Sequence, residues 1–194
     1  TLETGAMFGE RLFTGLYAQM GGRLVDEATG ELNVDEDIAE QVYEMLMRPF
    51  EEGLAEGPVA YEDTEALFQD NQSVFHINGV WAMAVYPTLE DVDFGVTQLP
   101  AVQGQPHYTW GDSHSLVFPK NDDPAKLGAA LTFGEWFSGK TMEWASAGHI
   151  PVNEDVLESQ EFLDLPMRSD YLEAAGNAVL APSVQGWSRV REEI

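Results

Sequence analysis

One stretch of the chain fits the formula of a phosphate-binding loop, G-x-x-x-x-G-K-[ST]. It reads GEWFSGKT and runs from Gly134 to Thr141. Such a loop wraps backbone N–H groups around phosphates, and it lies between a strand and a helix. Here residues 127–137 are apolar at helical spacing, and 135–137 are bulky or charged where a phosphate would need close approach to the backbone. We therefore expect two helices joined by a turn, with Gly139 as the C-cap of the first, and an ATP-binding module is only a third hypothesis.

Carboxylates and imidazoles are the other groups with catalytic potential. A glycosidase needs two carboxyl groups about 5–10 Å apart, one with a raised pKa. The 34 acidic residues do not by themselves indicate such a pair, so a carbohydrate-active hydrolase using Asp and Glu remains the alternative function. The four histidines lack metal-site spacing; Asp112 and His114 could share a strand face, but two ligands make neither a closed nor a catalytic site. We expect no catalytic residue, no metal and no cofactor.

Aromatic side chains beside turns are more informative. Trp81, Tyr108, Trp110 and Trp187 all lie next to Gly or Pro elements. Sugars present flat apolar C–H faces with a rim of hydroxyls, and aromatic rings next to polar groups match both features. The alternative for each tryptophan is packing in the core, since tryptophan is usually highly buried.

Composition limits the function classes. With 194 residues and 44% hydrophobic content, the chain can bury a sizeable core. Its formal net charge of −25 disfavours binding to nucleic acid or to anionic membrane surfaces. The chain has no cysteine, which excludes disulfides and thiolate chemistry. No apolar run approaches the ~18 residues that span a bilayer, and the first residues do not resemble a signal peptide, so we expect any targeting segment to lie upstream.

Helices and strands must position these side chains. Apolar periodicity predicts helices over 4–20, 35–50, 63–70, 80–89, 124–137, 142–147, 155–163, 169–175 and 187–194, with Asp35 as an N-cap and 124–137 strongly amphipathic. β-rich or alternating segments predict strands at 74–77, 94–100 and 113–119, and 104–111 is predicted to be a loop. Alternating helices and strands make the class α/β or mixed α+β.

Five segments in chain order resemble one known family. They are 66–81 (ALFQDNQSVFHINGVW), 94–100 (FGVTQLP), 110–120 (WGDSHSLVFPK), 148–152 (GHIPV) and 181–187 (APSVQGW). Together they are similar to the extracellular solute-binding proteins of family 1, which include maltodextrin- and glycerol-phosphate-binding proteins. The resemblance implies an α/β, periplasmic-binding-protein-like fold of type II, with ligand held between two lobes.

The resemblance also implies how the lobes divide the chain. Residues 1–108 correspond to the first part of the C-terminal lobe, 109–165 to a segment of the N-terminal lobe, and 166–194 to helices returning to the C-terminal lobe. The chain is then expected to be a fragment of a longer protein, mostly its C-terminal lobe. Strands whose sheet partners are elsewhere expose apolar surface and open edges, which favours swapped or clasped dimers.

A set of ligand-binding residues follows from the resemblance. Phe13 corresponds to an aromatic residue that lies under the ligand, and Trp81 to the tryptophan that stacks on it. Trp187 corresponds to the last aromatic residue that lines the binding site. His149 stands where the family often has tyrosine. The full predicted set is Arg11, Phe13, Trp81, Trp110, Asp112, Ser113, His114, His149 and Trp187.

The expected function is solute capture for an ABC importer. The protein is expected to be extracytoplasmic, in the periplasm or at the outer face of the cytoplasmic membrane, and attached to the membrane only through a lipoprotein-type anchor outside this chain. Its expected partners are a saccharide and the membrane subunits of the importer, with no nucleic acid. A bound ligand stabilises the closed state of the two lobes without catalysis. Arg11 is the one cation well placed for an anionic ligand, so a neutral saccharide is expected.

Overall fold

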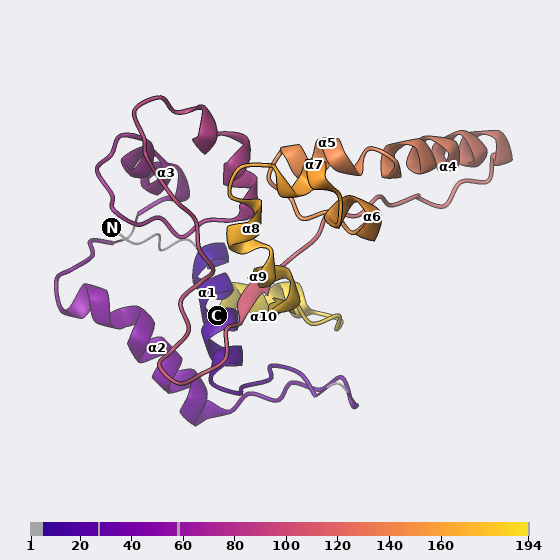
Figure 1. Ribbon diagram of the computed structural model, residues 1–194. Coiled ribbons are helices and arrows are strands. Elements are labelled where there is room, and N and C mark those ends of the chain that lie inside the picture. Colours follow the sequence, from indigo (N-terminus) through magenta and orange to yellow (C-terminus); the bar gives the residue numbers. More distant parts are fainter. Residues whose placement is uncertain (1–5, 27, 58, 194) are drawn as a thin grey trace. The chain divides into compact units, whose positions relative to one another are not determined.

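The described chain divides into two compact units. The computed structural model describes residues 6–26, 28–57 and 59–193 (Figure 1). The first unit contains the chain up to Ile77, residues 91–112 and the chain from Glu173 onward. The second unit contains residues 78–90 and 113–172, so it overlaps the expected lobe segment 109–165 and also includes a separate stretch. The chain therefore passes from one unit to the other several times along the sequence.

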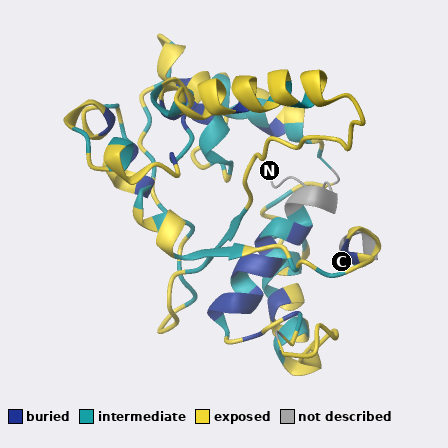
Figure 2. Ribbon diagram, turned by 90° about the vertical axis from the view of Figure 1, so that its right-hand side faces the viewer, coloured by how far each residue is buried: buried dark blue, intermediate teal, exposed yellow. Residues whose placement is uncertain are grey.

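A small parallel sheet lies in the first unit. Strand β1 (Thr109–Gly111) pairs in parallel with β2 (Ala178–Leu180), with Trp110 opposite Val179. Helix α1 (Ala6–Gln19) packs closely on β1, because a Cβ at Gly15 would lie only 3.4 Å from the Trp110 backbone nitrogen. Figure 2 shows buried residues gathered along α1 beside the two strands. Helices with a parallel sheet confirm the α/β class at this coarse level.

The hydrophobic core of the first unit joins three helices. Its buried members are Tyr17, Leu24, Val42 and Trp187, contributed by α1, the following loop, α2 (Glu36–Glu51) and α10 (Trp187–Glu193). The predicted N-cap is confirmed, since the Asp35 carboxylate accepts hydrogen bonds from the N–H groups of two residues in the first turn of α2, both at 3.1 Å. The backbone N–H of Asp35 donates to the Tyr17 hydroxyl at 2.7 Å, which ties the cap to the core.

A buried glutamine fastens the segment before β1 to α1. The Gln19 amide nitrogen donates to the carbonyls of Pro100 and Tyr108, at 3.2 and 2.9 Å. Its amide oxygen accepts from the N–H of Val102 at 2.8 Å. Gln19 is 1% exposed, so each bond satisfies a polar group that would otherwise be costly to bury. The first unit also contains α3 (Tyr61–Gln69) and α9 (Glu173–Gly176).

The second unit is helical in its described residues. Its elements are the 3₁₀ helices η1 (Val80–Ala84) and η2 (Tyr86–Thr88), and the α-helices α4 (Pro124–Ser138), α5 (Thr141–Ser146), α6 (Glu154–Leu157), α7 (Gln160–Leu163) and α8 (Arg168–Tyr171). The Asp123 carboxylate accepts from the N–H of Ala125 at 3.0 Å and caps α4. The expected amphipathicity of 124–137 is wrong, because apolar residues occur all around α4.

The three predicted strands are not strands in the structure. Residues 74–77, 94–100 and 113–119 join no sheet in the described chain, whereas β1 lies in the segment predicted as a loop and β2 was not predicted. A strand needs a neighbour for its backbone N–H and C=O groups, and only 109–111 and 178–180 meet as such neighbours. Three predicted helices are also divided: 80–89 forms η1 and η2, 155–163 forms α6 and α7, and 169–175 falls into α8 and α9.

Within residues 6–26, 28–57 and 59–193, no helix is both long and apolar enough to span a bilayer.

Candidate functional site

Arg11 and Trp110 form a pair in the first unit. The Arg11 guanidinium carbon lies 4.2 Å from the centroid of the Trp110 ring. α1 positions the arginine and β1 the tryptophan, and both side chains are half-buried. A guanidinium over an indole face is held by cation–π attraction and by hydrophobic contact. The pair combines flat apolar area with N–H donors, which are the two features that a sugar ring and its hydroxyls require.

Phe13 and Trp187 belong to the interior of the same unit. The Phe13 ring stacks on Tyr17 with centroids 5.5 Å apart and planes 15° apart, and it packs against the core cluster. Trp187 is itself a core member, with 8% of its surface exposed. Its buried indole Nε1 has no hydrogen-bond partner in the described chain, although a buried tryptophan N–H usually finds one. Both residues thus make packing contacts, and their role as ligand contacts remains a prediction.

A cavity of about 370 Å³ lies beside this core. Its wall includes Thr14 and Tyr17 of α1, Leu24 and Arg23 of the following loop, and Val184. Thr14 is 2% exposed, and its hydroxyl is buried without a partner among the described residues. The cavity has the size of a small-molecule pocket. Sequence reasoning did not find it, because a threonine within an apolar helical pattern gives no motif.

Three rings form a cluster in the second unit. The Trp144 and His149 rings stack with centroids 4.2 Å apart and planes 14° apart. The His114 ring meets both nearly edge-on, at 5.2 Å from Trp144 and 5.4 Å from His149. His114 and His149 were predicted from the sequence, whereas Trp144, within the predicted helix 142–147, was not singled out. Trp144 is 37% exposed, so part of the indole is accessible.

Electrostatics favour neutral imidazole in this ring cluster. The pKa of His149 is lowered mainly by burial, and further by the positive charges of His114 and Arg168. The ring therefore sheds its proton more readily than a free histidine does. A neutral imidazole has one N–H donor and one acceptor nitrogen, which suits hydroxyl groups.

Two buried side chains hold the turn that carries His149. Arg168 is 3% exposed and donates to the carbonyls of Ala145 and Ser146 at the end of α5, at 3.0–3.2 Å, and to that of Pro166 at 3.1 Å. The Tyr171 hydroxyl donates to the Gly148 carbonyl at 2.6 Å, and burial raises its pKa. A cation is favourable at a helix C-terminus, where carbonyls lack intrahelical partners.

The remaining predicted site residues are Trp81, Asp112 and Ser113. Trp81 is half-buried in η1 of the second unit, with its ring folded against Gly79 so closely that a Cβ there would overlap it. Asp112 is the last residue of the 91–112 stretch of the first unit, and Ser113 is the first residue of the 113–172 stretch of the second; both are exposed. The Ser113 hydroxyl has a long contact of 3.4 Å with the His114 carbonyl.

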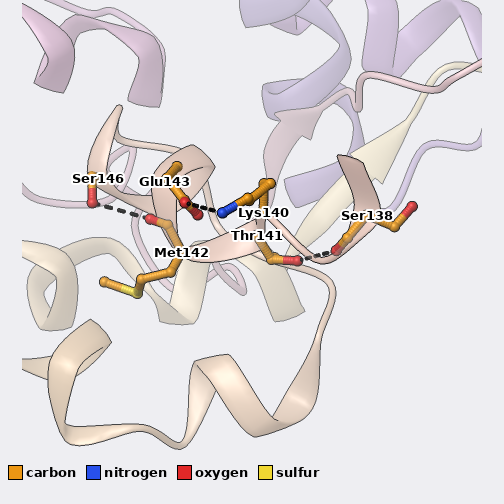
Figure 3. A network of polar contacts seen from close by, with 6 residues as sticks. All are labelled: Ser138, Lys140, Thr141, Met142, Glu143 and Ser146. Atoms are coloured by element: carbon orange, nitrogen blue, oxygen red, sulfur yellow. Dashed lines mark hydrogen bonds and ion pairs between the residues drawn. The ribbon is translucent and has the colours of Figure 1, made fainter. Parts of the chain in front are cut away.

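The phosphate-loop match does not form a phosphate-binding loop (Figure 3). The segment before it is α4, not a strand, and Gly139 caps that helix as expected. The Lys140 ammonium pairs with Glu143 at 3.1 Å, and the Thr141 hydroxyl donates to the Ser138 carbonyl at 2.7 Å. The two side chains that would hold phosphate and metal are thus engaged locally. The ATP-binding hypothesis is therefore not supported by this local structure.

Among the residues that the structure describes, no three His, Asp or Glu side chains come together as a metal site. The chain matches no protein-family model and no curated protein sequence.

Proposed function

We propose that this protein is the extracytoplasmic solute-binding component of an ABC importer, with a type II periplasmic-binding-protein-like fold, and that it binds a neutral saccharide without catalysis. Five sequence segments in family order support the proposal. Its coarse structural requirement is an α/β chain with two compact units, and the structure has both features.

One observation carries the proposal: each unit has a tryptophan, not fully buried, beside a nitrogen-bearing side chain. In the first unit Arg11 covers one face of Trp110. In the second unit His149 covers one face of Trp144. Such pairs supply apolar area for sugar C–H groups together with hydrogen-bonding groups for hydroxyls.

The proposed mechanism is a population shift between open and closed arrangements of the units. A saccharide that contacts both units binds the closed arrangement better than the open one, and it shifts the equilibrium by that difference in affinity. To move the population from 1:99 to 99:1, the ligand must bind the closed state about 10⁴-fold more tightly. The importer's membrane subunits then recognise the closed form, and a lipid anchor outside this chain keeps the protein at the membrane.

Charge favours a neutral ligand. The net charge of −25 repels anions over the whole surface. Arg11 is the cation that the predicted binding set provides, and its guanidinium already lies over Trp110. An anionic sugar would have to overcome the overall repulsion with that single group, whereas hydroxyl groups need no such compensation.

A saccharide panel with matched tryptophan variants tests the proposal. We expect calorimetry to detect binding of at least one neutral mono- or oligosaccharide by the protein, and Trp110→Ala or Trp81→Ala to abolish it. Trp136→Ala is the control, because Trp136 is 58% exposed on α4 and outside the predicted set. No binding across the panel, or equal losses in the control, would contradict the proposal. Sugar products released on incubation would instead support the hydrolase.

A further inference from the structure

One side of α1 holds the strand that carries Trp110. Arg11, Gly15 and Gln19 follow one another at intervals of four residues, so they lie along the same side of the helix. The Arg11 guanidinium lies over the Trp110 ring. Gly15 lets the backbone of β1 come close, since a Cβ there would lie 3.4 Å from the Trp110 nitrogen. Gln19 makes its hydrogen bonds to the segment that leads into β1.

The Gln19 side chain closes the loop before β1. Residues 103–107 of this loop are exposed. At the start of the loop, Gln19 donates to the Pro100 carbonyl at 3.2 Å and accepts from the Val102 N–H at 2.8 Å. At its end, Gln19 donates to the Tyr108 carbonyl at 2.9 Å. One side chain therefore fixes both ends of the loop relative to each other and to α1.

A glutamine suits this position because its amide combines two N–H donors with an acceptor oxygen. The donors and the acceptor are all used, and the residue is 1% exposed. Hydrogen bonds that are shielded from water are electrostatically stronger than exposed ones. An apolar side chain of the same length would leave the bonded carbonyls and N–H without this partner.

The Gln19 bonds complement the pairing of the two strands. Within the sheet, Trp110 lies opposite Val179, and the Thr109 N–H donates to the Asn177 carbonyl at 3.1 Å. These contacts set the register of β1 against β2. The bonds from Gln19 instead tie the chain to α1, and the Tyr108 carbonyl that they hold is two residues before Trp110. The helix that carries Arg11 and the strand that carries the indole are thereby joined.

We propose that Gln19 is the positioning residue of the Trp110 site. By closing the loop on α1, it places the Trp110 ring against Arg11 and so sets the affinity of that ring for a sugar. Binding groups must be held within about 0.5 Å of their productive geometry by the contacts that support them. The inference rests on the proposed saccharide binding, and it adds a residue that lies outside the predicted ligand set.

Fluorine NMR tests the positioning without any saccharide. The chain has five tryptophans, and in protein labelled with 5-fluorotryptophan the variant Trp110→Phe assigns the Trp110 resonance. Gln19→Met keeps the length of the side chain and removes its hydrogen bonds. It should shift the Trp110 resonance by more than the line width and leave that of Trp144, in the second unit, unchanged.

Gln19→Glu supplies a rescue that depends on pH. An ionised carboxylate has no donor for the carbonyls of Pro100 and Tyr108, whereas the protonated form can donate to one of them and still accept from the Val102 N–H. Burial raises the pKa of such a carboxyl above its ordinary value of about 4.3. The Trp110 resonance should therefore return toward the wild-type position at the same pH as the pH falls from about 8 to about 5. This variant also keeps the test open if Gln19→Met does not fold.

Calorimetry with glucose, maltose and maltotriose tests the consequence for binding. For a saccharide that binds the wild-type protein, Gln19→Met should raise the Kd about tenfold. Val42→Ala is the matched control, because Val42 is 0% exposed on α2 and its truncation destabilises the same unit through the core. The control should leave both the Trp110 resonance and the Kd unchanged, under conditions where circular dichroism shows the variants to be folded.

The outcomes separate the positioning role from the proposed function. An unchanged Trp110 resonance in Gln19→Met, or an equal shift in Val42→Ala, overturns the positioning role. A saccharide that binds the wild type and Gln19→Met equally well also overturns it. If none of the saccharides binds while the resonance shifts and is rescued in Gln19→Glu, the proposed function fails and the placement of the ring by Gln19 is supported.

Discussion

Replacing Arg168 with methionine should strongly destabilise the second unit. Arg168 is 3% exposed and makes four hydrogen bonds to three backbone carbonyls. Methionine keeps much of the aliphatic volume, so the loss is mainly polar. Two of the four bonds go to the carbonyl of Ala145, a residue with 0% exposure. A buried carbonyl without its donor costs about 1–3 kcal/mol, and hydrogen bonds from a charged donor contribute about 1.5–3 kcal/mol each.

These contributions overlap, because the same carbonyls are counted in both. We therefore expect Arg168→Met to lower the free energy of unfolding by about 3 kcal/mol, near the low end for removing one partner of a buried charged contact. With a urea m-value of about 1–3 kcal/mol/M, the midpoint should fall by roughly 1–3 M. Hydrogen exchange should increase in the peptides that cover 141–172.

Arg189→Met provides the matched control for this measurement. Arg189 is exposed on α10, and surface substitutions of this kind usually change stability by less than about 0.5 kcal/mol. Equal urea midpoints for the two variants would refute the assignment of Arg168 as the residue that satisfies the end of α5. Faster exchange limited to the first unit would refute it as well.

Three further predictions concern glycine, capping and pH. Gly148→Ala should lower the free energy of unfolding by more than about 1 kcal/mol, because Gly148 has φ +107° and a Cβ would overlap the Val80 carbonyl. The control is Gly128→Ala in α4, where a Cβ meets open space. In thermal unfolding this control should stabilise the protein by about 0.5–1 kcal/mol. Asp35→Ala should cost about 1 kcal/mol in urea unfolding by removing the α2 cap, whereas no measurable loss would refute the cap's role. Burial lowers the folded pKa of His149 below its unfolded value near 6.5, so its contribution is present above about pH 6.5 and is lost as pH falls through the folded pKa. His149→Gln should therefore flatten the pH dependence of stability below about pH 6.5, and an unchanged slope would contradict the shift.

Local signals allowed the helices to be predicted from the sequence. Asp35 before an apolar run marks the start of α2, and Gly139 marks the end of α4; both signals act within a few residues. The strands depended on distant partners. The segment Phe94 to Pro100 has strand-like composition, but no second strand meets it in the described chain. The short run Thr109–Gly111 becomes a strand because Ala178–Leu180 lies beside it.

The candidate site was only partly predictable for the same reason. Trp110 and Arg11 were each expected to bind ligand, but nothing in their spacing showed that the guanidinium would lie on the indole. His114 and His149 were expected separately, and their contact through Trp144 depends on how α5 packs. Cavity walls such as Thr14 gave no signal, because burial without a hydrogen-bond partner is a property of the folded chain.

The tryptophans show why residue type alone does not assign a role. Trp187 is 8% exposed and Trp136 is 58% exposed, although both lie in helices. Burial of Trp187 leaves its N–H without a partner in the described chain, a cost that packing of the ring must offset. Exposure of Trp136 leaves a large apolar ring in water, which is unfavourable. Partly exposed Trp144, stacked on a ring with donor and acceptor nitrogens, has neither cost in full. It is therefore better suited to exchange water for a sugar ring, so we expect Trp144→Ala to weaken saccharide binding in calorimetry while the Trp136→Ala control does not.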